Sequence, residues 1–192
     1  MRAEQFTLFK GMLERISKSS AFYKSKFDSM GLDPGDIKSS ADIKKLPFTT
    51  KEELRDAYPL GLQAAADEDI VRIHSSSGTT GKPVIIPYTA RDVDDWAEMM
   101  ARCFRAAGLT PLDRVQITPG YGLWTAGIGF QAGVERLGAM AIPMGPGNTG
   151  KQLQMMMDLK STVFIATSSY ALVIAEEVEK EDKLGGTEEK GT

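Results

Sequence analysis

The sequence has one cysteine, Cys103, and one histidine, His74, among its 192 residues. A single cysteine excludes a disulfide scaffold and a cysteine-cluster metal site. A single histidine excludes metal motifs that need two histidines. It could still serve a catalytic triad, but no serine of the chain lies in a G-x-S-x-G pattern. We therefore interpret His74 as a structural hydrogen-bonding residue rather than a catalytic base.

Long apolar runs and an excess of positive charge are also missing. No run of about 18 apolar residues is present, and the start of the chain lacks the apolar core of a signal peptide, so we expect no membrane association and a cytoplasmic location. The net charge of −3 and the pI near 5.3 argue against a nucleic-acid partner. The 42% hydrophobic content and the length suit one domain with a real core.

What the sequence does have is a stretch dense in hydroxyl and glycine residues that ends in a lysine. It reads Ser75-Ser76-Ser77-Gly78-Thr79-Thr80-Gly81-Lys82-Pro83. The β-branched segments 69–74 and 84–88 on either side predict that it joins two strands. Glycines let successive backbone N–H groups point inward, and hydroxyl groups and a cation add to them, which suits phosphate oxygens.

This stretch does not fit the Walker pattern G-x-x-x-x-G-K-[ST]. Ser76 stands where the first glycine is needed, and Pro83 stands where a serine or threonine is needed. A proline there also disfavours the helix that a Walker loop opens. A solvated linker rich in glycine, serine and threonine is the alternative interpretation. The shortness of the stretch, its strand flanks and its terminal lysine favour a phosphate loop.

Residues 1–60 predict a helical segment that covers one side of a later sheet. Phe6, Phe9 and Leu13 follow the spacing of one helical face. Thr50 and Glu53 fit a capping box at the start of a short helix.

After residue 88, helices and strands alternate. The periodicity predicts helices near 93–104, 123–137, 149–159 and 168–180, and strands near 114–118, 139–143 and 162–166. This order predicts an α/β fold with a mostly parallel sheet and helices on both faces, which the helical N-terminal segment precedes. From residue 181 the chain is charged and rich in glycine, and we interpret 181–192 as a frayed tail.

Three loops are predicted to follow strands at the edge where such sheets bind ligands, namely 75–82, 119–124 and 145–148. The predicted helix 123–137 carries Gly127, Gly129 and Gly133, although glycine costs about 1 kcal/mol relative to alanine inside a helix. Something is therefore expected to approach this helix closely, either the sheet in helix-on-sheet packing or a ligand.

Together these motifs make the chain resemble the N-terminal portion of the phenylacetate–CoA ligase family, in the adenylate-forming superfamily of acyl-CoA synthetases. The loop 75–83 matches the phosphate loop of the superfamily. The motifs that resemble the narrower family are Leu46-Pro47-Phe48-Thr49-Thr50-Lys51, Tyr121-Gly122-Leu123-Trp124-Thr125-Ala126-Gly127, Glu135-Arg136-Leu137-Gly138 and Ser168-Ser169-Tyr170. The resemblance covers roughly residues 4–180.

The resemblance implies a two-step reaction. An aryl-acetate carboxylate attacks the α-phosphorus of ATP to give an acyl-adenylate and pyrophosphate, and the thiol of CoA then displaces AMP. Residues 61–180 would form an α/β subdomain of the AMP-binding type. ATP, magnesium and CoA are the implied cofactors, and the resemblance assigns no metal ligand in this chain.

The resemblance also assigns site residues. The ATP phosphates would be held by residues 75–82, with Thr80 and Lys82 catalytic. Tyr121, Trp124 and Gly127 would line the aryl-acid pocket, although both aromatic residues could instead be plain core.

The chain departs from the family in its length. Full-length members are more than twice as long, and their adenine and ribose contacts, magnesium carboxylate and C-terminal lysine have no counterpart here. We therefore expect a fragment of the large domain that is inactive alone and that self-associates or pairs with the missing remainder of a ligase. The alternatives are a ligase part for another aryl acid and a non-catalytic domain that binds nucleotide or serves in assembly.

Overall fold

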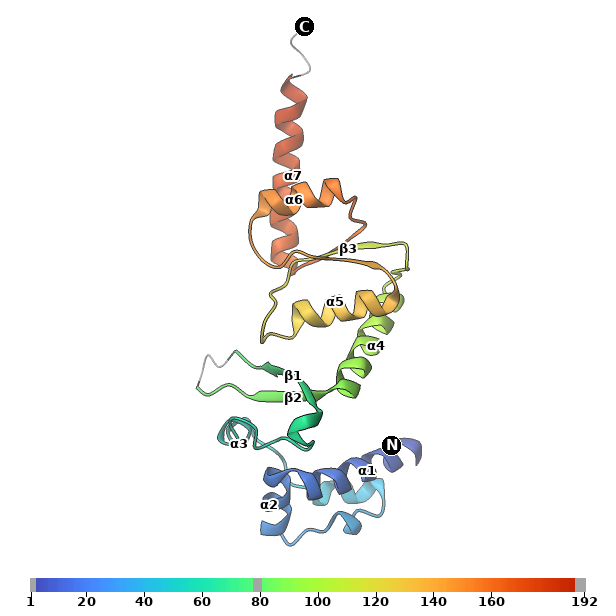
Figure 1. Ribbon diagram of the computed structural model, residues 1–192, viewed down its shortest axis with the longest axis vertical. Coiled ribbons are helices and arrows are strands. Elements are labelled where there is room, and N and C mark those ends of the chain that lie inside the picture. Colours follow the sequence, from blue (N-terminus) through green and yellow to red (C-terminus); the bar gives the residue numbers. More distant parts are fainter. Residues whose placement is uncertain (1–2, 78–80, 189–192) are drawn as a thin grey trace. The chain divides into compact units, whose positions relative to one another are not determined.

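The computed structural model describes residues 3–77 and 81–188, of which residues 181–188 are described by their backbone, and Figure 1 labels its helices and strands. The chain falls into two compact units that divide between Val93 and Asp94. Each unit has its own hydrophobic cluster. The predicted subdivision into 1–60, 61–180 and 181–192 stays a prediction.

The second unit alternates helices and strands. Its elements, together with the helix that leads into it, are α4 (Ala90–Ala106), β3 (Arg114–Ile117), α5 (Ala126–Leu137), β4 (Met140–Pro143), α6 (Thr149–Asp158), β5 (Val163–Ile165) and α7 (Ser168–Glu188). Helix α5 begins later than the predicted start at 123. Gly122 has a left-handed φ of 102°, and the N–H of Gly127 donates to the carbonyl of Gly120, so a turn occupies the residues before the helix. Helix α7 continues to Glu188, past the end that the sequence predicts near residue 180.

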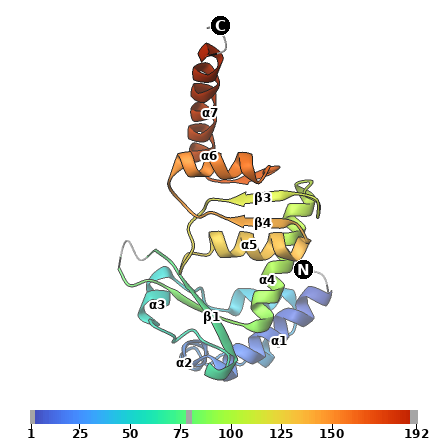
Figure 2. The ribbon, with the colours of Figure 1, turned by 45° about the horizontal axis from the view of Figure 1, so that its top comes forward.

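The three strands of the second unit form a parallel sheet in the order β4-β3-β5, and Figure 2 shows β3 beside β4. Side chains alternate across the middle strand. Val115 and Ile117 are fully buried in a cluster with Ala101 of α4 and with Val134 and Leu137 of α5. This face of the sheet therefore carries the apolar core of the unit.

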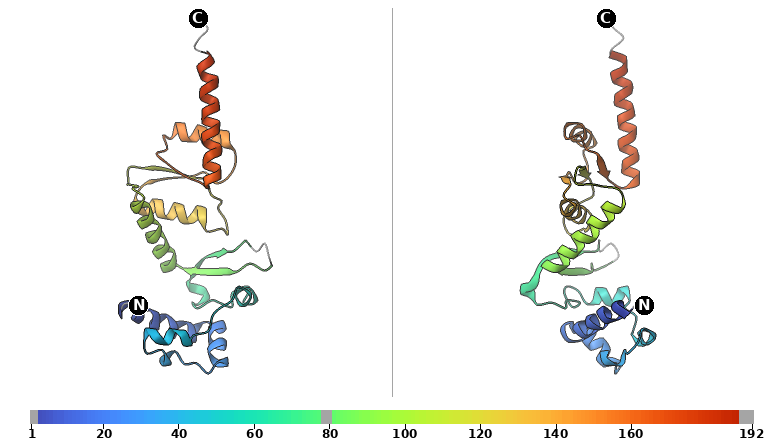
Figure 3. Two further views of the ribbon diagram at one scale, coloured as in Figure 1. Left: turned by 180° about the vertical axis from the view of Figure 1, so that it is seen from behind. Right: turned by 90° about the vertical axis from the view of Figure 1, so that its right-hand side faces the viewer.

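The opposite face of β3 is polar and meets α6. Gln116 is fully buried, and its side-chain amide donates to the carbonyl oxygen and to the Oε1 of Gln152 in α6, at 3.0 and 2.7 Å. Helices thus lie on both sides of the strands, as the right-hand view of Figure 3 shows. The predicted parallel sheet with helices on both faces is confirmed.

The glycines of α5 make room for α4. A Cβ atom on Gly129 would lie 2.5 Å from the Trp96 ring, and one on Gly133 would collide with the Cβ of Met100. The close neighbour that the sequence predicts at these two positions is therefore another helix, neither the sheet nor a ligand. The packing of α4 against α5 offsets the cost of glycine in a helix interior.

The first unit is helical at its start and ends in a hairpin. Its elements are α1 (Ala3–Ser19), α2 (Ala21–Ser29), α3 (Lys51–Asp56), β1 (Ile70–Ser75) and β2 (Ile85–Thr89), with short 3₁₀ turns η1 (Pro34–Asp36), η2 (Ser40–Lys45) and η3 (Asp67–Asp69). Leu13, Phe27 and Ile37 form its buried cluster, and Phe6 and Phe9 pack against it as the helical spacing predicts.

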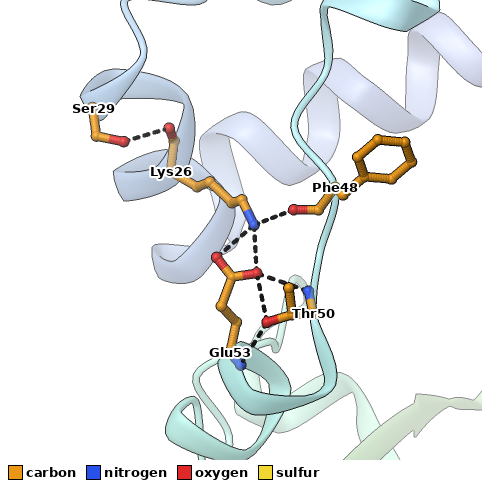
Figure 4. Close-up of polar contacts among 5 residues, drawn as sticks. All are labelled: Lys26, Ser29, Phe48, Thr50 and Glu53. Carbon is orange, nitrogen blue, oxygen red and sulfur yellow. Dashed lines mark hydrogen bonds and ion pairs between the residues drawn. The ribbon is translucent and has the colours of Figure 1, made fainter.

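An ion pair joins α2 to α3 in the first unit (Figure 4). The Nζ of Lys26 lies 2.7 Å from the carboxylate of Glu53 and donates to the carbonyl of Phe48 at 2.6 Å. The same carboxylate accepts the N–H of Thr50, whose hydroxyl accepts the N–H of Glu53. This is the predicted capping box. The hydrogen bond from Lys26, followed by that from the Thr50 backbone, lowers the pKa of Glu53 from its ordinary 4.5.

Among the residues that the structure describes, the two strands of the first unit pair only with each other, in antiparallel register with His74 opposite Ile86. The connection 76–84 is too short for the crossover that parallel strands need. The expectation that the loop 75–82 shares one sheet edge with the loops 119–124 and 145–148 is therefore wrong. The first loop is the tip of a separate hairpin, whereas the other two follow strands of the parallel sheet.

Candidate active site

The hairpin loop, residues 76–84, begins with two hydrogen bonds between its ends. The N–H of Ser76 donates to the carbonyl of Val84 at 3.0 Å, and the N–H of Val84 donates to the Oγ of Ser76 at 2.9 Å. The Ser76 hydroxyl thus serves as an acceptor and keeps its own proton for another partner. Ser75 is a strand residue opposite Ile85, and Ser77 is exposed.

The charge of the hairpin loop is exposed to solvent. The Nζ of Lys82 lies over the ring of Tyr58, 5.7 Å from the ring centroid, and Gly81 beside it has a left-handed φ of 135°. A cation over an exposed ring is held by only about 0.5–1 kcal/mol, so an anion can compete for it. No pattern in the sequence places Tyr58 beside this lysine. Gly78, Thr79 and Thr80, which complete the predicted loop, lie outside the described residues.

A pocket of about 470 Å³ lies in the second unit, at the carboxyl ends of all three parallel strands. Its lining comes from the segments that follow β3, β4 and β5 and from the helices α5 and α7. The lining residues are Thr118, Pro119, Gly120, Trp124, Ala126, Phe130, Pro146, Gly147, Ala166, Thr167 and Tyr170. This is the edge at which open parallel sheets bind ligands.

The pocket is mainly apolar. Three aromatic rings contribute to it, those of Trp124, Phe130 and Tyr170. Its hydroxyl groups are held by neighbours within the unit: Thr118 donates to the carbonyl of Ile165 at 2.9 Å, and the Tyr170 hydroxyl lies 3.4 Å from that of Thr149. A pocket with aromatic walls and few polar groups suits a flat apolar ligand with one polar end.

Of the predicted aryl-pocket residues, Trp124 is in the lining, whereas Tyr121 and Gly127 are not. A Cβ atom on Gly127 would lie 2.7 Å from the carbonyl oxygen of Gly120 and 2.8 Å from the Tyr121 ring, so the chain itself fills the space beside this glycine. Burial, and to a lesser degree the charge of Glu135, raises the pKa of Tyr121.

Part of the pocket lining lies in the loops 119–124 and 145–148, which the sequence predicts at the ligand-binding edge, namely Pro119, Gly120, Trp124, Pro146 and Gly147. The segment after β5 is not among the predicted loops. Thr118, Ala166 and Thr167 are ordinary residues by type, and only their position just after a strand marks them. Tyr170 was noted as part of a family motif but was not assigned to a pocket. The rule that ligands bind at the carboxyl ends of parallel strands predicts the loops after β3 and β4, and applying it to β5 as well would have found Ala166 and Thr167.

Neither a metal centre nor a membrane span is evident in the described parts of the chain. Residues 3–77 and 81–188 contain no group of three or more His, Cys, Asp and Glu side chains placed to hold a metal ion. None of the helices in those ranges combines the length and apolarity that a membrane crossing requires.

Comparison with known proteins gives close relatives. No protein-family model matches the chain. It is 44% identical over 186 residues to the phenylacetate-coenzyme A ligase of Escherichia coli (strain K12), which covers 97% of this chain and 42% of that enzyme. It is 41% identical over 181 residues to the phenylacetate-coenzyme A ligase of Pseudomonas putida, which covers 94% of this chain and 41% of that enzyme.

Solved structures of a CoA ligase are also similar to this chain. A 2-hydroxyisobutyryl-CoA ligase in complex with 2-HIB-AMP and CoA, in its thioesterification state, matches with a TM-score of 0.83 and 29% identity, covering 95% of this chain and 41% of that one. An open conformation of that ligase matches with a TM-score of 0.82 and 27% identity, covering 91% and 42%. The chain is thus a homologue of the phenylacetate–coenzyme A ligases over nearly its whole length, and it spans about two fifths of the length of those enzymes.

Proposed function

We propose that this chain is the N-terminal part of an aryl-acid–CoA ligase, which activates phenylacetate with ATP to an acyl-adenylate and then forms the CoA thioester. The observation that carries the proposal is the sequence identity of 41–44% to two phenylacetate-coenzyme A ligases over 94–97% of this chain. Because the chain spans only part of those relatives, we expect it to be inactive alone.

The pocket would hold the acid. Its aromatic residues Trp124, Phe130 and Tyr170 offer faces and edges to a phenyl ring. Tyr121 and Gly127 are proposed to act from beside the pocket, because the Tyr121 ring packs against Gly127. Burial of the ring supplies binding energy at about 25 cal/mol per Å² of apolar surface, and the carboxylate stays at the polar end to react.

The loop 75–82 would hold the phosphates of ATP. When the carboxylate attacks the α-phosphorus, negative charge moves to the departing pyrophosphate, so donors and cations must already lie where that charge develops. Lys82 is exposed and only weakly held over Tyr58, and the Ser76 hydroxyl has a proton to donate. Ser75 and Ser77 would add hydroxyls, Gly81 would add a backbone N–H, and Gly78, Thr79 and Thr80 would complete the cradle. Thr80 and Lys82 are the proposed catalytic residues.

CoA and magnesium belong to the same proposal. The structurally similar 2-hydroxyisobutyryl-CoA ligase was solved with an acyl-adenylate and CoA, which supports the use of both by a related chain. Magnesium would be bound together with the ATP phosphates and would supply positive charge beside them. Among the described residues no carboxylate cluster fits a metal ion, so we assign it no protein ligand and no step. A cytoplasmic location is part of the proposal.

Pairing with a complementary ligase piece is also proposed. In the described part of the chain, β4 and β5 are the two edge strands of the sheet, and α7 exposes Leu172, Val173 and Val178. Unpaired strand edges and exposed apolar residues favour association. Sedimentation of the chain alone should reveal self-association, and a monomer at high concentration would contradict it.

The activity is tested by complementation. The chain is mixed with ATP, phenylacetate and CoA, and pyrophosphate release is measured with and without the complementary piece of the E. coli relative. We expect no release from the chain alone and release after complementation. Lys82→Ala should abolish the recovered activity, whereas Lys44→Ala, which removes an exposed lysine of the same unit, should not. Recovery that Lys82→Ala leaves unchanged would remove the loop from the mechanism, and failure to bind phenylacetate would remove the pocket.

A further inference from the structure

A hydrogen-bonded chain through two buried amides crosses the second unit from Ser161, in the turn before β5, to the wall of the pocket. The Ser161 hydroxyl donates to the Oε1 of Gln116 at 3.0 Å, and the side-chain amide of Gln116 donates to Gln152. The side-chain amide of Gln152 in turn donates to the carbonyl of Gly145 at 2.8 Å and lies 3.4 Å from the carbonyl of Gly147. Gln116 and Gln152 are 0% and 1% exposed, so these bonds are made without competition from water.

The segment that Gln152 holds has an unusual backbone. Gly145, Gly147 and Asn148 all have left-handed φ values, of 70°, 89° and 49°. Left-handed backbone is disfavoured for a residue with a side chain, so Asn148 needs support from its surroundings. The N–H of Gly145 donates to the carbonyl of Ile117, and the Asn148 side chain accepts the N–H of Lys151 at the start of α6. Gln152 supplies the bonds that satisfy the carbonyls of the segment.

This segment is one wall of the pocket. Pro146 and Gly147 are lining residues; Gln152 binds the carbonyl of Gly147 itself and that of Gly145, on the other side of Pro146. Gln152 itself is absent from the lining. A side chain that does not touch the pocket therefore fixes the backbone that does.

The geometry points to Gln152 as a positioning residue, anchored by Gln116, that sets the shape of the acid pocket by fixing residues 145–147. The identity of the ligand in this inference rests on the proposed function. The role of Gln152 in fixing residues 145–147 does not depend on it. An amide is needed at 152 because it must accept from Gln116 and donate to Gly145 at the same time. Methionine matches its length but provides no donor, and glutamate matches its shape and keeps only the acceptors.

The first test needs no ligand. Hydrogen exchange of the Gly145 amide is compared with that of the Thr118 amide, which donates to Ile165 on the other side of the pocket. In Gln152→Met and Gln152→Glu, we expect Gly145 to exchange at least about tenfold faster, while Thr118 changes by less than about threefold. Gln154→Met is the matched control, since Gln154 is exposed on the same helix and bonds to Asp158. Equal acceleration of both amides, or none, would overturn the inference.

The second test uses phenylacetate as the probe and calorimetry on the full 192-residue chain. We expect Gln152→Glu to weaken phenylacetate binding by about tenfold or more at a temperature where the chain stays folded, and Gln154→Met to leave it unchanged. If wild type does not bind phenylacetate, the proposed function fails, and the exchange test still decides the role of Gln152. If wild type and Gln152→Glu bind equally, the inference fails and the proposed function stands. Should the Gln152 variants not fold, Gln116→Met, which leaves the bonds of Gln152 to the loop but removes its anchor, should give the same selective exchange at Gly145.

Discussion

The hairpin loop and the pocket are held in place by different means. The loop closes through two bonds between Ser76 and Val84, which are neighbours across one hairpin. The pocket is assembled from three strand ends and depends on the apolar core beneath β3 and on the buried amides above it. A local element of this kind responds to changes in its own few bonds, whereas an assembled pocket responds to packing far from its lining.

The largest effect is expected from Gly133→Leu, which breaks the support of the pocket. A side chain at this position collides with Met100 of α4, and overpacking should lower the free energy of unfolding of the second unit by about 3 kcal/mol. Urea denaturation measures the loss. Gly150→Ala is the control, because no atom lies within 4 Å of the added methyl group and the helix should gain up to about 1 kcal/mol. Equal results for the two variants would mean that α4 does not pack closely on α5.

A smaller effect is expected from Thr50→Ala in the unit that carries the loop. The hydroxyl of Thr50 accepts the N–H of Glu53, and its loss should lower the free energy of unfolding by about 1 kcal/mol, as for other helix N-caps. Hydrogen exchange of the α3 amides measures this cost. Thr7→Ala, in the middle of α1, should change stability by less than about 0.5 kcal/mol. A Thr50 variant that behaves like the Thr7 variant would contradict the role of the cap.

The third expected effect is a dependence on pH. The pKa of Glu53 is lowered in the folded chain, chiefly by the hydrogen bond from Lys26, so its contribution to stability is complete above its ordinary pKa of 4.5 and is lost as the pH falls through the lower folded value. In Lys26→Met this part of the acid destabilisation should disappear. Unfolding measured between neutral pH and pH 3 in both proteins checks the difference in slope. Identical slopes would show that the ion pair does not stabilise the folded state.

The smallest effect is expected from Ser76→Ala. The Val84 N–H loses its acceptor in an exposed loop, which should cost about 0.5 kcal/mol and speed exchange at Val84 alone. The exchange rates of the pocket amides should not change, because the bonds that close the loop are made within the hairpin. Ser77→Ala, at the exposed neighbouring position, should leave the Val84 amide unchanged. A change that spread to Gly145 would break the distinction between the two elements.

Elements with regular spacing were predictable from the sequence. Trp96, Met100 and Phe104 mark one face of α4, and Gly108 after the helix has the left-handed φ of 93° that a terminating glycine adopts. The alternation of helices and strands was enough to predict a parallel sheet, because a parallel connection needs a crossover helix. Thr50 with Glu53 forms the predicted cap.

Features that depend on distant partners were not predictable. The short connection 76–84 predicts that the strands on either side of it form an antiparallel hairpin, but nothing in these residues tells whether that hairpin joins the parallel sheet, and it was wrongly grouped with that sheet. Gly129 and Gly133 indicated a close neighbour, but only the packed helices reveal that it is Trp96 and Met100. The buried pair of Gln116 and Gln152 gave no signal, since an isolated glutamine looks like a surface residue until its partner is placed.

The parallel order β4-β3-β5 has a practical consequence for redesign. Because β3 is the middle strand, the cavity at its end is reached from turns that lie far apart in the chain, near residues 118, 146 and 166. A mutant library that randomises one contiguous segment of the sequence would alter one wall of this cavity and leave the other walls unchanged. Changing the ligand preference of the cavity therefore calls for coordinated substitution of all three turns, with Gln116 and Gln152 behind them left intact.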